Sequence, residues 1–426
     1  MATQSTVTTA PQRHPPGLYV LFFTELWERY SFYSMMAILT LYMDEVLRFN
    51  EHLSGQVYGS YIAGVYFLPL IGGWLADRVL GFNKAVIIGA ALMMLGHFVL
   101  AVEQLPFFFT ALALLACGSG LLKPNVSTIV GNLYHDRPAL RDSGFNIFYM
   151  GINIGAFISP IAVAWFRARY GWSVAFASAG VAMAISLAVF IGFNRYVEAG
   201  ARRVDETTEV VDLPPREARA RVSALLIIYL IVIAFWVAFY QNGFTLTFWA
   251  RDNTATSIAP ETFQAVEPLG IILFTPILVG VWNWLRERNR EPSTLGKILL
   301  GMVFTALSFA VMIGAALLAG DHGRVSPWWL VSSYGIIAIG EICLSPMGLS
   351  LVTKVAPPRL RGMMMGAWFV TLSLGGYFSG TLGAYWQTIS HAEFFTIVTA
   401  LVLGAAVLTI GAMRWLRPTF TMAGAD

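Results

Sequence analysis

Long apolar stretches alternate with short polar segments along the whole chain, and this alternation predicts twelve helices that cross a membrane. A helix needs roughly 20 mostly apolar residues to span the hydrocarbon core of a bilayer, and every apolar stretch reaches that length. The predicted fold class is therefore an all-α membrane protein. Its expected spans cover residues 18–43, 53–76, 83–103, 106–130, 143–166, 172–194, 222–249, 262–285, 296–319, 327–352, 360–385 and 391–415.

A polar stretch in the middle of the chain divides the predicted spans into two sets of six. Residues 195–221 mix Arg with Asp and Glu and contain Pro214-Pro215, which is typical of a cytoplasmic linker with room for an amphipathic surface helix. The expected domains are a cytoplasmic tail over 1–17, a six-helix bundle over 18–194, the linker, a second six-helix bundle over 222–415 and a tail over 416–426.

Basic residues are distributed unevenly between the predicted loops. With the N-terminus placed in the cytoplasm, 20 of the 27 Lys and Arg residues fall in cytoplasmic segments and five fall in the outer loops. Short loops rich in Lys and Arg stay on the cytoplasmic side during membrane insertion. We therefore expect a multi-pass protein of the cell membrane (inner or plasma membrane) with both termini in the cytoplasm.

The composition agrees with a membrane protein and excludes several classes of function. Hydrophobic residues make up 57% of the chain and charged residues only 12%, too few to cover a soluble protein of this length. No nucleic-acid patch, metal-ligand spacing or nucleophile–base pair is present, so we expect neither an enzyme nor a nucleic-acid partner. The lipid bilayer is the expected surrounding, and no obligatory protein partner is evident. Cys117 and Cys343 both lie in apolar stretches, so no disulfide framework is expected.

Three charged residues interrupt the first predicted span. Glu25, Glu28 and Arg29 occupy positions i, i+3 and i+4, so they share one face of the helix. Arg29 would lie about 17 Å along the helix, near the middle of the membrane. A charge at that depth costs roughly 2.5–3.5 kcal/mol, so we expect it to face a polar cavity or a partner. The alternative is a self-neutralising patch that only holds helices together.

Other polar residues lie deep within later spans. Lys123 is followed by Pro124 in the fourth span, Asn153 lies in the fifth, and Glu341 lies in the tenth, about 21 Å from its outer end. Buried ionisable groups mark ligand or ion pathways, and Pro124 frees a carbonyl that can line a cavity. Lys123 could instead snorkel to the inner interface, and Asn153 could bond a neighbouring helix.

The loop after the second span contains a short motif of glycine and charged residues. Gly72-Gly73 is followed by Asp77-Arg78, which resembles the signature of the major facilitator superfamily between its second and third helices. Two sets of six spans joined by a linker fit the same superfamily. The glycines allow close helix approach. Asp77 and Arg78 are expected to act in gating, by latching neighbouring helix ends on the inner side.

Motifs in both halves resemble the proton-dependent oligopeptide transporter (POT) family of that superfamily. Its hallmark is the Glu-x-x-Glu-Arg sequence that ends at Arg29. The resemblance extends over nearly the whole chain, through Tyr66, Lys123-Pro124-Asn125, Phe148-Tyr149, Ile152-Asn153 with Gly155, Phe235-Trp236, Gln264 with Pro268, Gly340-Glu341, Ser345-Pro346 and Met364–Phe369.

The resemblance implies import of di- and tripeptides together with protons, by alternating access and with no cofactor. An extended dipeptide separates its charged termini by roughly 6–7 Å, so opposite fixed charges in the two halves can grip both ends. By similarity, Arg29 and Lys123 would bind the peptide carboxylate, Glu341 the amine and Asn153 the backbone. The side-chain pockets would be lined by Tyr33, Tyr66, Trp236, Trp368 and Phe369.

The same resemblance implies how protons and gating would be handled. Glu25 and Glu28 would take protons near Arg29, and Glu341 is a further proton site. Lys123 and Glu341 would pair across the two halves when the inner side closes. Each of the aromatic residues, taken alone, also fits simple core packing or lipid contact.

Several positions depart from the family pattern. The usual tyrosine pair of the first span is Phe32 and Tyr33 here. The family often has an arginine and a glutamate that close the outer side, at positions that hold Met36 and Tyr240 in this chain. Glu267 stands where the family usually has Asn. We predict that Glu267 replaces the missing glutamate, as a proton site or as a ligand for the amine, although it could instead reach outer water without a role.

Two other functions fit parts of this pattern. The same fold could carry another small substrate, such as nitrate, an amino acid or a drug-like cation. Arg29, Lys123 and Glu341 together favour a zwitterion over a plain anion, because both signs of charge are present. A non-transporting nutrient sensor is the more distant alternative, since both tails are short and carry no signalling domain.

Overall fold

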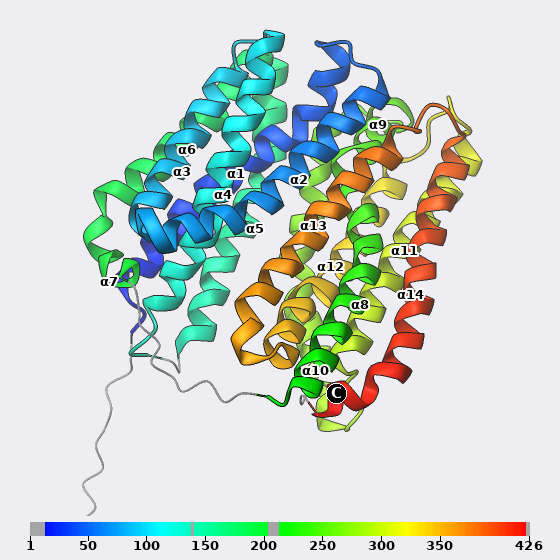
Figure 1. Cartoon of the computed structure of the whole chain (residues 1–426). Coiled ribbons are helices and arrows are strands. Elements are labelled where there is room, and N and C mark those ends of the chain that lie inside the picture. The colour runs from blue at the N-terminus through cyan, green and yellow to red at the C-terminus, as the bar shows by residue number, and fades with distance from the viewer. Residues whose placement is uncertain (1–12, 138–139, 203–212, 423–426) are drawn as a thin grey trace, which may run out of the picture.

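The computed structural model describes residues 13–137, 140–202 and 213–422, and its long elements are all α-helices (Figure 1). This confirms the predicted fold class. The first six long helices are α1 (Pro16–Glu45), α2 (Glu51–Leu75), α3 (Phe82–Leu100), α4 (Leu105–Asn132), α5 (Arg141–Tyr170) and α6 (Trp172–Gly192). The second six are α8 (Pro215–Phe239), α10 (Val266–Glu287), α11 (Thr294–Ala319), α12 (Pro327–Val355), α13 (Arg361–Gly383) and α14 (His391–Met422).

Two short α-helices, α7 (Glu198–Ala201) and α9 (Thr245–Asp252), are also present in the described chain. Ten segments of the described chain are long and apolar enough to cross a membrane. α1 and α13 are not among these ten, but both are long helices, and with them the number of long helices is the predicted twelve. α1 is less apolar because its middle carries Glu25, Glu28 and Arg29.

The described helices differ from the expected spans mainly around the linker. α8 begins at Pro215, within the stretch expected to be polar linker. Proline suits the first position of a helix because its fixed φ is helical and its missing N–H would be unpaired there anyway. An i,i+4 ion pair between Glu217 and Arg221, 2.6 Å long, supports this added turn. Residues 203–212 in the middle of the expected linker lie outside the described residues, as do residues 1–12 and 423–426 of the expected tails.

Each set of six helices packs into a bundle, and the two bundles stand side by side (Figure 1). In the first, α1 packs against α5 and α6, and α4 packs against α2 and α3. In the second, α11 packs against α12 and α14, and α8 packs against α13 and α14. The two halves therefore repeat the same kind of packing.

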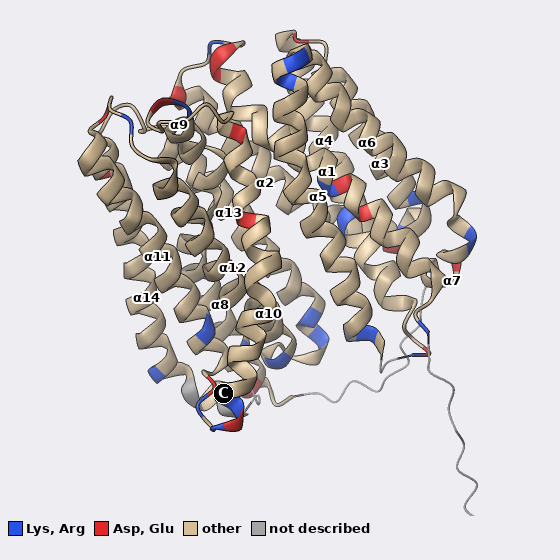
Figure 2. Cartoon of the chain, turned by 180° about the vertical axis from the view of Figure 1, so that it is seen from behind, with Lys and Arg blue, Asp and Glu red and all other residues tan. Residues whose placement is uncertain are grey.

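Both described ends of the chain lie at one end of the molecule, which we call the terminal end; the opposite end is the distal end (Figure 1). Loops 46–50, 101–104, 253–259 and 320–326 form the distal end. Figure 2 shows that most charged residues gather at these two ends and that few lie midway along the helices. The helix surfaces between the two ends would face the apolar core of a bilayer, where charged residues are costly, so this distribution fits a membrane-spanning protein.

Glycines allow α2 and α13 to touch where the two halves meet. A Cβ atom on Gly380 would lie 2.1 Å from the carbonyl oxygen of Gly55, and one on Gly376 would lie 2.1 Å from the side chain of Ile62. No side chain larger than hydrogen fits at such backbone separations. This contact joins α2 to α13 between the two bundles.

A second close approach holds α2 against α4 inside the first half. Pro124 cannot donate to the carbonyl four residues earlier, which belongs to Gly120. A Cβ atom on Gly72 would lie 2.1 Å from that carbonyl oxygen. The carbonyl that Pro124 frees therefore packs against α2, whereas the sequence suggested that it could line a cavity. Gly72 belongs to the predicted signature, so its role in helix approach is confirmed.

The loop between α10 and α11 contains a compact ion-pair cluster at the terminal end. Glu291 accepts hydrogen bonds from Arg286 at 2.5 Å and from Lys297 at 2.6 Å. These bonds, with that from Arg286 the larger cause, lower the pKa of Glu291 to about 2. Glu291 is therefore ionised at neutral pH and connects the end of α10 to the start of α11.

Substituting Gly380 by Ala should destabilise the protein, because the added methyl group overlaps the Gly55 carbonyl and separates α2 from α13. Overpacking of this kind costs on the order of 1–3 kcal/mol. Gly404→Ala on α14 is the matched control, since nothing lies within 4 Å of the atom it adds. Thermal unfolding in detergent should show a lower Tm for Gly380→Ala and an unchanged or higher Tm for Gly404→Ala. Equal Tm values would contradict the proposed tight contact.

Candidate functional site

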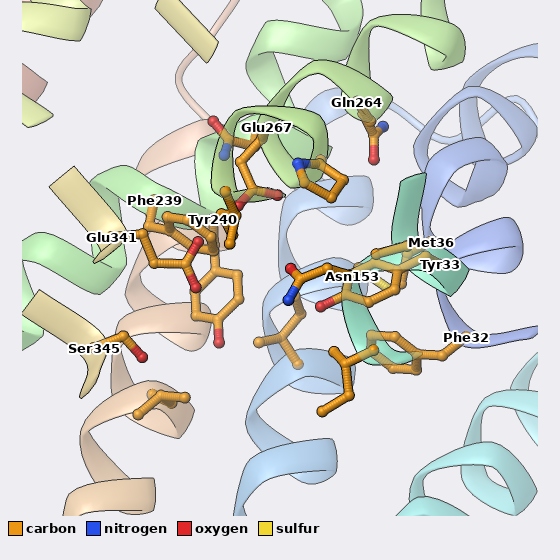
Figure 3. Close-up of a pocket in the computed structure, with 18 of the residues that line it drawn as sticks. Phe32, Tyr33, Met36, Asn153, Phe239, Tyr240, Gln264, Glu267, Glu341 and Ser345 are labelled. Carbon is orange, nitrogen blue, oxygen red and sulfur yellow. The ribbon is translucent and has the colours of Figure 1, made fainter. Parts of the chain in front are cut away.

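A cavity of about 280 Å³ lies between the two halves, and both contribute side chains to its wall. Figure 3 shows the side chains that surround it. Tyr149 lines the cavity and is 46% exposed. The predicted site residues that line it are Tyr33, Tyr66, Asn153, Trp236, Glu267, Glu341 and Phe369.

The charged residues predicted in α1 form a buried cluster next to this cavity. Arg29 is 6% exposed, and its Nε lies 3.1 Å from a carboxylate oxygen of Glu25 and in direct contact with Glu28. The Nη2 atom of Arg29 and the Oε1 atom of Glu28 have no hydrogen-bond partner among the described residues. Arg29 is thus paired through one nitrogen, and its buried Nη2 atom has no partner among the described residues.

Lys123 lies behind the cavity wall and is held there by aromatic rings. Its Nζ is 4.3 Å from the centre of the Phe32 ring and 5.0 Å from that of Tyr66. Both rings line the cavity. A cation over an aromatic face gains about 0.5–2 kcal/mol, which stabilises the ammonium group in this buried position. Arg29 and Lys123 are therefore brought together, one layer behind the cavity surface.

Two carboxyl groups of the second half enter the cavity itself. Glu267 lies in the first turn of α10 and Glu341 lies midway along α12, and their carboxyl groups are within hydrogen-bonding reach of one another. Two ionised carboxylates about 4 Å apart repel by about 4 kcal/mol at an effective dielectric constant of about 20. A hydrogen bond between them needs a proton on one of the two. This pair can therefore hold a proton or accept a cation.

Trp368 is not brought to the cavity. Its ring lies against Gly348, where an added Cβ atom would be 1.9 Å away, and it meets Tyr229 edge to face at 5.8 Å. Trp368 is 2% exposed and belongs to the core of the second half. The neighbouring Phe369 faces the cavity instead. Trp368 and Phe369 are neighbours on α13, so their side chains leave the helix in different directions. Only the ring of Phe369 can reach a ligand in the cavity.

The seventh transmembrane segment is broken beside the cavity. α8 ends at Phe239, a 3₁₀ turn covers Tyr240–Gly243, and α9 continues from Thr245. The first half bonds the carbonyls that this break leaves free: Tyr58 donates to the Tyr240 carbonyl at 3.0 Å, and Thr40 donates to the Gly243 carbonyl at 2.7 Å. Neutral hydrogen bonds therefore cross between the halves where the family pattern predicts a charged pair.

An ion-pair network joins the halves at the distal end. Glu261 is fully buried and accepts from Arg167 with both carboxylate oxygens, at 2.7 and 3.0 Å. Arg167 also lies 3.6 Å from Glu45, and Arg251 pairs with Asp44 and lies 3.8 Å from Glu45. We call these residues the distal network. Among the described residues, hydrogen bonds and ion pairs between the halves lie at or beyond the middle of the helices, toward the distal end.

Asp77 and Arg78 lie in a π-helical turn over Ala76–Leu80, at the terminal end of α2. Both side chains are exposed, and neither makes an ion pair within the described ranges. Gly81 ends this turn with φ +77°, a conformation that glycine adopts without strain. No group of three His, Cys, Asp or Glu side chains in the described part of the chain is arranged to hold a metal ion.

Several cavity residues were not assigned from the sequence. Tyr149, Tyr58, Asn242 and Tyr334 all line the cavity. Tyr149 precedes Asn153 by one helical turn and shares its face, so helical spacing alone contains the signal. Asn242 carries no such signal, because it enters the cavity through the break in the seventh segment. Tyr58 and Tyr334 are tyrosines in apolar stretches, which by residue type cannot be separated from core residues.

Sequence comparison identifies relatives along almost the whole chain. The family model described as PTR2, the POT family, matches residues 83–213 and 214–397. The peptide transporter YePEPT of Yersinia enterocolitica is 32% identical, with 93% of this chain and 94% of that protein aligned. Dipeptide and tripeptide permease A of Escherichia coli is 31% identical, with 87% of this chain and 85% of that protein aligned.

Comparison with solved structures gives the same result for the fold. A peptide transporter POT in complex with sulfate superposes with a TM-score of 0.87 at 31% identity, over 96% of this chain and 97% of that chain. A mutant peptide transporter POT in complex with alafosfalin superposes with a TM-score of 0.85 at 32% identity, over the same shares of each chain. A POT family transporter in complex with 5-aminolevulinic acid has a TM-score of 0.86 at 27% identity, over 95% and 97%. The fold is the major facilitator fold.

Replacing Glu261 by Gln should separate the distal ends of the two halves, because Arg167 would then keep only Glu45, at 3.6 Å, as an ionic partner. Spin labels on His52 of α2 and Leu318 of α11, both exposed near the distal end, would report this as a longer inter-label distance. Electron–electron resonance in lipid nanodiscs is the measurement, with the native cysteines replaced.

Glu103→Gln is the control, since Glu103 is exposed in a distal loop and makes no ion pair within the described ranges. It should leave the distance distribution unchanged. A distribution that is identical for Glu261→Gln and the parent would mean that the distal network does not hold the halves together.

Proposed function

The chain belongs to the POT family, and from this membership we propose that it carries di- and tripeptides across the cell membrane together with protons. Its relatives are transporters, so the chain is a transporter and not an enzyme. The observation that supports peptides most directly is the cavity between the halves, which has two carboxyl groups of the second half in its wall and two cations of the first half directly behind it. A zwitterionic peptide fits between charges so arranged.

In this proposal the peptide amine binds Glu341 and the peptide carboxylate binds Arg29 and Lys123. The Nη2 atom of Arg29 is buried and has no partner among the described residues, and it would gain one from a carboxylate that passes the cavity wall. Arginine binds carboxylates through two parallel hydrogen bonds. Lys123 reaches the same group by leaving its place between the rings of Phe32 and Tyr66. Movements of this kind are common when a ligand enters a site.

The remaining predicted wall residues take the other parts of the peptide. Asn153 binds the backbone, since its amide can both donate and accept. The rings of Tyr33, Tyr66, Trp236 and Phe369 form adaptable pockets for the side chains. Trp368 acts only indirectly, by supporting α13 behind Phe369.

Protons are taken up by the buried carboxyl groups that have too few hydrogen-bond donors or cations around them. Glu25 and Glu28 share Arg29, and Glu28 keeps one oxygen without a partner. Glu267 and Glu341 face each other without a cation, so one of them keeps a proton until a substrate amine arrives. Proton binding and peptide binding are then linked, because both act on the same pair.

Transport follows alternating access of the cavity to the two sides of the membrane. The structure is closed toward the distal end by the distal network and the broken seventh segment. We assign the distal end to the outside, which leaves both termini in the cytoplasm. Closure of the inner side would bring Lys123 toward Glu341, with Asp77 and Arg78 latching neighbouring helix ends.

One observation favours a second candidate substrate within the same function. A solved POT family transporter that is 27% identical to this chain was crystallised with 5-aminolevulinic acid, which carries one amine and one carboxylate. A small amino acid of that kind would satisfy Glu341 and Arg29 without a peptide bond. Transport of another small zwitterion is therefore the alternative to peptide transport.

Uptake of labelled dialanine into proteoliposomes tests the proposal. Accumulation is expected with an inward proton gradient and not without one. Arg29→Ala and Glu341→Ala should each reduce accumulation more than about tenfold, because a charged hydrogen bond to one terminus is worth about 1.5–3 kcal/mol. Arg48→Ala, at an exposed loop position, should retain full uptake.

The other outcomes of this experiment are informative. Exchange without accumulation would mean that the halves rock but that proton coupling is lost. An absence of uptake, and of competition by any small peptide, would contradict peptide transport and favour the small-zwitterion alternative.

The role of Glu267 in coupling is tested by Glu267→Gln, which keeps the side-chain shape and removes the titratable group. We expect gradient-driven accumulation of dialanine to fall about tenfold or more while exchange without a gradient persists. Glu287→Gln, at the exposed end of the same helix, is the matched control. If the substitution leaves accumulation and its pH profile unchanged, Glu267 does not replace the missing glutamate of the seventh segment.

A further inference from the structure

When Glu267 and Glu341 are both ionised, the second half of the cavity holds more negative charge than a peptide with a neutral side chain can satisfy. Glu267 and Glu341 enter it from different helices, and Figure 3 shows both side chains pointing into the same part of the cavity. The Oε1 atom of Glu267 and the Oε2 atom of Glu341 have no hydrogen-bond partner among the described residues. Both carboxyl groups therefore have capacity left for a ligand.

No Lys or Arg of the described chain lines the cavity beside these two carboxyl groups. The first half is different, because the two carboxylates Glu25 and Glu28 are matched there by the two cations Arg29 and Lys123. When all of these groups are ionised, the first half contributes no net charge and the second half contributes two negative charges. A zwitterionic peptide is itself neutral, so this excess persists after it binds.

The wall around the carboxyl pair suits a second cation. Trp236 and Tyr240 stack on one another with ring centres 5.9 Å apart, and both rings line the cavity. Trp236 is 3% exposed and Tyr240 is 7% exposed, so both rings are almost fully buried within this wall. Aromatic faces of this kind can contact an ammonium group and the alkyl chain that carries it.

We propose that Glu267 makes this cavity selective for peptides whose first residue is basic, such as lysine. This inference rests on the proposed peptide transport and identifies the preferred substrate class of the same site. The peptide amine binds Glu341, and the side-chain ammonium group of the first residue binds Glu267. Both groups branch from the same α-carbon, and the flexible side chain can fold back to reach a carboxyl group that lies next to Glu341.

The same geometry predicts that the position of the basic residue matters. A lysine at the second position of a dipeptide branches from the carbon that carries the peptide carboxylate. Its side chain would point toward the half that already holds Arg29 and Lys123. We therefore expect no preference for alanyl-lysine, so the selectivity is for position as well as for charge.

Competition against labelled dialanine exchange, without a proton gradient, tests this inference. Lysyl-alanine should inhibit at concentrations about tenfold lower than norleucyl-alanine, which has a side chain of similar length and no charge. Alanyl-lysine should inhibit no better than alanyl-norleucine. In Glu267→Gln, lysyl-alanine and norleucyl-alanine should become equally effective.

A second measurement covers the case in which Glu267→Gln does not exchange dialanine. Thermal stabilisation of the purified variant by each peptide reports binding alone and should again lose the preference for lysyl-alanine. Equal inhibition by lysyl-alanine and norleucyl-alanine in the parent protein would overturn the inference and leave peptide transport standing. A preference that persists in Glu267→Gln would overturn the assignment to this residue. If the parent neither binds nor exchanges dialanine or any other peptide, the proposed function itself fails, and the inference with it.

Discussion

Ionised groups inside an apolar protein must be paired or must face a polar cavity, and the arrangement of this molecule depends on that constraint. In α1, Glu25 and Glu28 surround Arg29, so that the cluster can stay buried. Lys123 is stabilised by two aromatic rings in place of a carboxylate. Within the described part of the chain, Glu267 and Glu341 have no cation beside them, and they point into the cavity. The charges of the two halves therefore determine where a cavity must lie and what it can hold.

Side-chain size explains how the halves touch while a cavity remains between them. Gly55 and Gly380 bring the backbones of α2 and α13 into contact, and the two halves are joined along these two helices. Elsewhere, rings such as Tyr33, Tyr66 and Tyr149 occupy the wall and keep the facing helices apart. The broken seventh segment fills the distal part of the interface, where hydroxyl groups of the first half bond its free carbonyls. Glycines thus provide the contact between the halves, aromatic residues form the cavity wall, and hydroxyl groups bond the segment that closes the distal part.

The sequence predicts most of the fold, because a bilayer requires each span to be long and apolar. It predicts the cavity residues Asn153, Glu267 and Glu341 for a related reason: polar groups at that depth stand out against apolar neighbours. Aromatic residues do not stand out, so nothing in the sequence separates Phe369 in the cavity wall from Trp368 in the core. The pairing of Arg167 with Glu261 is equally inaccessible, since 94 positions separate the two and no local pattern relates them.

The closure at the distal end consists of two layers of different chemistry. The outermost layer is the distal network, in which Arg167 and Arg251 are partly exposed to solvent. Dissolved ions screen such charges over about 8 Å at physiological ionic strength. The layer beneath consists of neutral hydrogen bonds from Thr40 and Tyr58, both almost fully buried, and these bonds carry no net charge to screen. Salt therefore acts on the partly exposed charges of the rim and not on the neutral seal beneath, so the closure has one layer that responds to ionic strength and one that does not.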